Sequence, residues 1–205
     1  MDSPTGTLVI ACGALAHEIA ALRRANGWAF DVQCLPPELH NRPERIAPAV
    51  REQLALHRQR YRSVFVAYAE CGTGGALDRL LAEEGIERLP GAHCYEFYAG
   101  SGTFAALADA EPGTFYLTDF LTRHFERLVI QSLGIDRHPE LAAEYFRNYR
   151  KLTYLAQTRP SPLSAQARLI AERLNLKYEE HFTGFGGLAE HLGALASRTP
   201  PAWQT

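Results

Sequence analysis

The sequence contains no long hydrophobic run and no excess of charge of either sign. No apolar stretch approaches the ~20 residues that a helix needs to cross a bilayer, so we expect no membrane-spanning segment. The formal net charge is −2 over 205 residues and the arginines are scattered, so the chain lacks the positive field that attracts nucleic acid or an anionic membrane. The first residues have neither the basic nor the apolar region of a secretory signal. These absences predict a cytoplasmic protein that acts on a small-molecule substrate.

Cysteine is also scarce, with four residues in the whole chain: Cys12, Cys34, Cys71 and Cys94. Thiols stay reduced in the cytosol, so we interpret these four as metal ligands, nucleophiles or core residues before disulfides. Cys34 lies in the middle of a predicted strand and is expected to be part of the core.

The hydrophobic pattern alternates between short strands and helices of about ten to fifteen residues. It predicts an α/β fold with a mostly parallel sheet and helices on both faces. We expect one α/β domain over residues 1–195 and a loose C-terminal tail over 196–205, with two tightly fused, pseudo-duplicated halves as the alternative. Strands are predicted over 7–12, 29–35, 64–70, 92–97, 151–158 and 177–182, with a strand or strand-to-helix junction over 112–121; helices are predicted over 14–24, 47–60, 75–85, 103–110, 121–133, 139–150, 164–174 and 188–195.

Three of the thiols follow a common pattern. Cys12 and Cys71 each end a predicted buried strand beside a glycine turn, and Cys94 is expected in or near the end of the short strand over 92–97. The carboxyl ends of parallel strands meet at one edge of a sheet, where ligands bind. Gly72 and Gly74 would let the backbone approach a ligand closely. Three thiolates at one edge predict a metal site, with zinc the best-suited ion.

Histidine and acidic residues complete the expected site. His40, in the proline-rich loop after the second strand, is the candidate fourth ligand, and His93 is a weaker one. Glu70, Asp119 and His40 are the candidate proton-transfer groups, because each is an ionisable side chain near a strand end. Asp119 lies in an apolar segment that would raise its pKa, and it could equally cap the helix that follows.

Other interpretations of the same residues stay open. Free cysteine is among the most buried residue types, so each thiol alone is consistent with simple packing. The three thiols could instead hold an iron–sulfur cluster. A third possibility is a metal-free crevice for a small molecule, built on His40, Asn41 and Tyr116.

The order of several segments is similar to that of a known family, the prokaryotic domain-of-unknown-function family 1638. The similarity covers roughly residues 7–192, and the family pattern at the central cysteine is YGDCG or YGxCG. Here Ala69 replaces the glycine, which makes that turn less permissive. The segments are LVIACGALAHEI, LPPELHNRPERI, VAYAECGTGG, HCYEFYAG, PGTFYLTDFL and LGIDRHPELAAEYFRNYRKLTYLAQ.

The resemblance implies a setting but no established activity. Family members occur among genes for corrinoid-dependent methyl transfer, so the resemblance implies a link to one-carbon metabolism and a metal site on Cys12, Cys71 and Cys94. A metal-dependent transferase, hydrolase or lyase would fit this setting. A non-catalytic accessory protein that docks on a corrinoid methyltransferase would fit it too.

Overall fold

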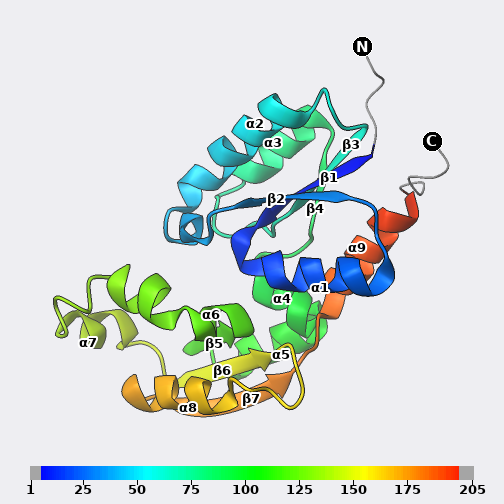
Figure 1. Ribbon diagram of the computed structural model, residues 1–205. Coiled ribbons are helices and arrows are strands. Elements are labelled where there is room, and N and C mark those ends of the chain that lie inside the picture. Colours follow the sequence, from blue (N-terminus) through cyan, green and yellow to red (C-terminus); the bar gives the residue numbers. More distant parts are fainter. Residues whose placement is uncertain (1–5, 199–205) are drawn as a thin grey trace. The chain divides into compact units, whose positions relative to one another are not determined.

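The computed structural model describes residues 6–198 and divides into two compact units (Figure 1). The first unit contains the chain up to Phe97 together with the segment from Gly187 onward, and the second contains Tyr98–Gly186. Each unit has its own parallel sheet with helices packed against it, which confirms the predicted α/β class. None of the helices described is long and apolar enough to cross a membrane.

The sheet of the first unit has the order β2-β1-β3-β4, and all of its strand pairs are parallel. Its strands are β1 (Thr7–Cys12), β2 (Asp31–Leu35), β3 (Ser63–Ala67) and β4 (Glu87–Arg88). All six residues of β1 are buried, as expected for a strand that pairs on both sides and is covered on both faces. Because β2 and β3 lie on opposite sides of β1, the chain changes direction between β1 and β3.

Helices cover both faces of this sheet (Figure 1). They are α1 (Ala16–Asn26) on one face and α2 (Ile46–His57) with α3 (Ala76–Glu84) on the other, where α2 and α3 contact each other. Short 3-10 helices follow two strands: η1 (Gly13–Leu15) after β1, and η2 (Pro37–Asn41) with η3 (Pro43–Arg45) after β2. The last helix, α9 (Gly186–Arg198), brings Gly193 against the indole of Trp28.

The second unit has the sheet order β5-β6-β7, again all parallel. One face of this sheet carries a hydrophobic core in which Leu117, Leu152 and Tyr154 pack with Phe125 and Phe146. The strands are β5 (Thr114–Thr118), β6 (Lys151–Ala156) and β7 (Lys177–Phe182); the helices are α5 (Ser101–Ala110), α6 (Asp119–Arg123), the π-helix η4 (Glu126–Gln131), α7 (Leu141–Phe146) and α8 (Ser164–Arg173).

The structure differs from the sequence prediction in several elements, of which three bear on the site and on the predicted boundaries. Residues 92–97 do not form a strand, because Cys94 begins the helix α4 (Cys94–Ala99) and the Glu96 carboxylate accepts the backbone N–H of Ala92 at 2.9 Å. The predicted helix over 121–133 is divided into α6 and the π-helix η4. Residues 196–198 belong to α9, and the rest of the predicted loose tail lies outside the described residues.

Candidate functional site

The candidate site lies where the sheet of the first unit changes direction. β1 ends at Cys12, and η2, which carries His40, follows β2. Cys71 comes four residues after the end of β3. A direction change between neighbouring parallel strands leaves a crevice outside their carboxyl ends, which is the usual ligand site of open α/β sheets. The topology therefore brings Cys12, Cys71 and His40 to the place where chemistry is expected.

Cys12 is fixed by the turn that follows β1. Its thiol accepts the backbone N–H of Ala14 at 3.3 Å and so caps η1. Burial raises the pKa of this thiol to about 12. A Cβ at Gly13 would lie 2.8 Å from the Leu35 carbonyl oxygen and 3.0 Å from Pro37 Cδ, so only glycine lets the end of β1 pass this close to the end of β2.

His40 is held next to Cys12 by this close approach. Its Nδ1 lies 3.6 Å from the Cys12 sulfur, and the Pro37 carbonyl accepts a hydrogen bond from the same ring. Nε2 is buried without a hydrogen-bond partner among the described residues, so we assign the Pro37 bond to Nδ1–H. Burial lowers the pKa of His40, which favours the neutral ring. The result is a neutral imidazole with an unused Nε2 lone pair, the form that metals bind.

Cys71 occupies a strained turn. Its φ is +52°, a left-handed conformation that is unusual for residues with a Cβ. The turn is held from two sides, because the Cys71 N–H donates to Ala92 O at 2.8 Å and the Glu70 carboxylate accepts the N–H groups of Gly72 and Gly75, each at 2.9 Å. Strain of this kind persists only when the surroundings enforce it.

The three thiols predicted to form the site are electrostatic neighbours. Burial raises the pKa of Cys71 to about 11, and that of Cys94 well above its ordinary value. Negative charge on Cys71 raises the pKa of both Cys12 and Cys94, and charge on Cys12 raises that of Cys94. The backbone N–H of Cys94 also points toward the Cys71 thiol and favours its charged form. Without a cation these thiols therefore stay protonated at neutral pH.

Sequence reasoning missed two residues beside the thiols. Tyr68, the residue after β3, is 1% exposed, and its ring stacks on the His40 ring at 6.1 Å with an interplanar angle of 15°. Its hydroxyl lies next to the Cys12 thiol and has no oxygen or nitrogen partner among the described residues. Cys34, expected in the core, is half-buried, and its charge raises the pKa of Cys12. A polar tyrosine directly before the cysteine turn was the available signal for the first of these.

The acidic residues near the thiols already have partners. The Glu70 carboxylate also accepts the Thr73 hydroxyl, and these bonds lower its pKa. Glu96 accepts the Ala92 N–H, as described above. Asn41 lies exposed at the end of η2. In this conformation Glu70 and Glu96 shape the segments that carry Cys71 and Cys94.

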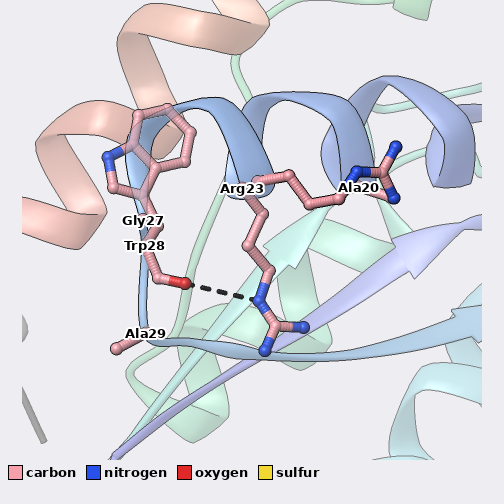
Figure 2. Close-up of a pocket in the computed structure, with 6 residues that line it drawn as sticks. Ala20, Arg23, Gly27, Trp28 and Ala29 are labelled. Carbon is pink, nitrogen blue, oxygen red and sulfur yellow. Dashed lines mark hydrogen bonds between the residues drawn. The ribbon is translucent and has the colours of Figure 1, made fainter.

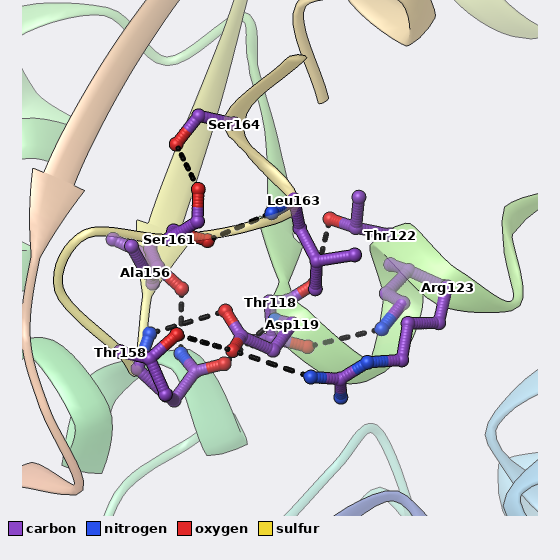
Figure 3. Close-up of polar contacts among 12 residues, drawn as sticks. Thr118, Asp119, Thr122, Arg123, Ala156, Thr158, Ser161, Leu163 and Ser164 are labelled. Carbon is purple, nitrogen blue, oxygen red and sulfur yellow. Dashed lines mark hydrogen bonds and ion pairs between the residues drawn. The ribbon is translucent and has the colours of Figure 1, made fainter. Parts of the chain in front are cut away.

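Asp119 and Tyr116 belong to the second unit. Asp119 is 1% exposed, and its Oδ1 accepts the Tyr154 hydroxyl at 2.6 Å and the Gln157 N–H at 3.1 Å. Arg123 forms an ion pair with Oδ2 at 3.6 Å (Figure 3). The residue that caps α6 is Thr118, whose hydroxyl accepts the Leu121 N–H, so Asp119 does not serve as that cap.

Tyr116 lies on β5 with its ring 5.1 Å from that of Phe104, and burial raises its pKa. The structure places Tyr116 and Asp119 in the second unit, and the three thiols and His40 in the first.

Within residues 6–198, no three side chains of His, Cys, Asp or Glu are already arranged as ligands of a metal ion. Two buried thiols, a half-buried third thiol, a buried imidazole lone pair and a buried phenol are chemically suited to a soft or borderline cation.

A separate hollow of about 420 Å³ lies at the end of α1 (Figure 2). It is lined by Ala20, Arg23, Arg24, Gly27, Trp28 and Ala29, and Arg23 Nε donates to the Trp28 carbonyl at 3.3 Å. The hollow is open to solvent and its lining contains no thiol. It therefore does not belong to the candidate site.

Comparison with known families supports the resemblance seen in the sequence. Residues 34–192 match the family model described as protein of unknown function (DUF1638). The chain belongs to this family. The match includes His40, Cys71 and Cys94 but begins at Cys34, so Cys12 and the rest of β1 precede it. No curated protein and no solved structure matches the chain.

Proposed function

We propose that this DUF1638 protein is a metal–thiolate protein in which Cys12, Cys71 and Cys94 bind one zinc ion and His40 completes or gates the site. The observation that carries the proposal is the mutual effect of the three thiols. Cys12 and Cys71 are buried and Cys94 is half-buried, and charge on one raises the pKa of another, which supports a common cluster at the sheet edge. A bound cation would stabilise the charged thiolates against their mutual repulsion, because a coordinating thiol is deprotonated outright.

His40 supports the same proposal by a different route. Its imidazole is neutral, its Nδ1 side is held by a backbone carbonyl and the Cys12 thiol, and its Nε2 is unused. Metal-binding histidines are usually oriented by a carbonyl or carboxylate on the second ring nitrogen. His40 therefore has the hydrogen bonding of a ligand before any metal is bound.

The proposed reaction class is methyl transfer to a thiol. This part follows from the family resemblance and from general chemistry, since zinc bound by thiolates can hold a substrate thiol in its nucleophilic, deprotonated form. The methyl group would pass as a cation equivalent from a methylated corrinoid to the sulfur, leaving the reduced corrinoid as the other product. Small-molecule thiols would then be the substrate class.

The test is the metal content of the untagged protein purified under nitrogen. We expect one zinc per chain in the wild type, and less than half of that in each of Cys12→Ser, Cys71→Ser and Cys94→Ser. Cys34→Ser is the matched control, because Cys34 lies near Cys12 but is not a proposed ligand; it should keep the full metal content. A brown protein that contains iron and sulfide would instead indicate an iron–sulfur cluster on the same cysteines. Metal-free wild-type protein would refute the proposal.

A second measurement tests the reaction. Zinc-loaded protein mixed with methylcobalamin and a small thiol should convert the methylcobalamin spectrum to that of the reduced corrinoid. Metal binding without this conversion would favour the accessory role, in which the protein docks on a methyltransferase and performs no transfer itself.

A further inference from the structure

The Tyr68 hydroxyl is under-satisfied in the folded chain. The side chain is 1% exposed, and its hydroxyl lies next to the Cys12 thiol without an oxygen or nitrogen partner among the described residues. Sulfur is a weak acceptor, and a buried hydroxyl with no better partner is unfavourable by comparison with phenylalanine, which would fill the same space. Buried polar groups without good partners are rare and call for a physical reason.

One nitrogen of the adjacent His40 ring likewise lacks a hydrogen-bond partner among the described residues. His40 Nε2 is also buried without a partner, and the His40 and Tyr68 rings stack at 6.1 Å. With the ring proton assigned to Nδ1, as above, Nε2 presents a lone pair. A phenol donor and an imidazole acceptor thus lie side by side next to Cys12, and neither is used by the protein.

We infer that Tyr68 and His40 together bind a small protic ligand at the thiol cluster, with the Tyr68 hydroxyl as donor and His40 Nε2 as acceptor. The ligand carries an S–H or O–H group, which donates a hydrogen bond to the imidazole and accepts one from the phenol. It is small, because the Cys12 and Tyr68 side chains that it would meet are only 3% and 1% exposed. The inference rests on the proposed function in placing this ligand next to the bound metal. Because the ligand then occupies Nε2, His40 gates the site and does not serve as a fourth metal ligand.

The metal-free protein provides a first test that does not depend on the proposed function. If the hydroxyl lacks a good partner in the protein, Tyr68→Phe should leave the thermal midpoint of chelator-treated protein within about 3 °C of wild type, or raise it. A fall well beyond this would show that the protein itself satisfies the hydroxyl, and would overturn the inference. Tyr61→Phe is the control, because the exposed Tyr61 hydroxyl donates to Asp31.

The second test uses Co²⁺ as a spectroscopic substitute for zinc. Hydrosulfide and methanol, as S–H and O–H probes, are titrated separately into Co²⁺-loaded wild type, Tyr68→Phe and Tyr61→Phe. We expect Tyr68→Phe to bind one Co²⁺ with unchanged thiolate charge-transfer bands, but to need about tenfold more of at least one probe for the same spectral shift. The probe that responds identifies the ligand class.

Equal titrations in Tyr68→Phe and wild type would overturn the inference and leave the metal proposal intact. A wild type that takes up no Co²⁺ would instead refute the metal proposal, and with it the placement of the ligand beside a metal. The two failures are therefore distinguishable.

Discussion

The Glu70 carboxylate accepts the backbone N–H of Gly75 at 2.9 Å, across the turn that begins with Cys71. It also accepts from Gly72 and from the Thr73 hydroxyl. A glycine-rich turn after a strand commonly presents its N–H groups to an external anion, but here a side chain of the same turn takes that place. Glu70 is consequently a structural acceptor in this conformation, and a role in proton transfer would require these bonds to break.

Replacing Glu70 should open the turn. We expect Glu70→Ala to lower the free energy of unfolding by about 1–2 kcal/mol, since it leaves two backbone donors without their acceptor. Glu70→Gln should lower the free energy of unfolding by less, because the glutamine amide oxygen can still accept a backbone N–H. Urea unfolding checks both, with Glu83→Ala as the control for an exposed carboxylate in a surface ion pair. An unaffected Glu70→Ala would show that water replaces the carboxylate without cost.

The close approach of Gly13 to the Leu35 carbonyl should be equally sensitive to substitution. Gly13→Ala places a Cβ 2.8 Å from the Leu35 carbonyl, and the backbone must shift to relieve the overlap. We expect a loss of about 1–3 kcal/mol in unfolding free energy. Gly102→Ala is the matched control, because Gly102 lies in α5 with nothing within 4 Å of its added Cβ, and alanine is the better helix former. Equal stabilities of the two variants would contradict the close approach.

The Asp119 cluster should stabilise the second unit. In Asp119→Asn an amide replaces one of the carboxylate oxygens that meet the Tyr154 hydroxyl, the Gln157 N–H and the Arg123 guanidinium. Because Asp119 is buried, we expect a loss of about 2–4 kcal/mol in unfolding free energy. Thermal unfolding monitored by circular dichroism measures it, and the exposed Asp109→Asn should change nothing. A stable Asp119→Asn protein would argue that the site tolerates a neutral side chain and serves another purpose.

Acid should weaken the cross-strand pair of Glu179 and Lys151. Hydrogen bonds from Lys151 and His181 lower the pKa of Glu179 below its ordinary value of 4.5. Since the folded pKa lies below the unfolded one, this carboxylate stabilises the fold above about pH 4.5 and loses its contribution as the pH falls through the lowered value. The stability difference between wild type and Glu179→Gln should therefore still be present at about pH 5 and vanish at lower pH. Chemical denaturation at a series of pH values tests this. A difference that persists at pH 2 would contradict it.

Much of the fold can be predicted from the sequence, because each strand and the helix after it can be recognised from a short continuous segment. Buried runs such as residues 8–12 and 64–67 have the period and composition of central parallel strands, and each is followed by a helical pattern. The placement of Cys12 and Cys71 at one edge then follows from the rule that parallel strands end together. Cys94 was misplaced because the alternating segment HCYEF resembles a strand, whereas the contact of Glu96 with Ala92 begins a helix there.

The partners of the site residues could not be predicted in this way. The sequence identifies Glu70 as a carboxylate. It does not show that N–H groups of the same turn donate to this carboxylate, because that depends on the φ angles of Cys71 and three glycines. It shows Tyr68 as one more large residue in a buried run. Only the geometry reveals that its hydroxyl lies beside Cys12 without a good acceptor.

At Cys71 the residue that best fits the left-handed backbone is not the residue that supplies a thiol. Glycine adopts a φ of +52° without strain, so Cys71→Gly would relieve the turn while removing the thiol. A population of variants selected only for heat resistance should thus enrich glycine or asparagine at this position, and one selected for whatever the thiol does should retain cysteine.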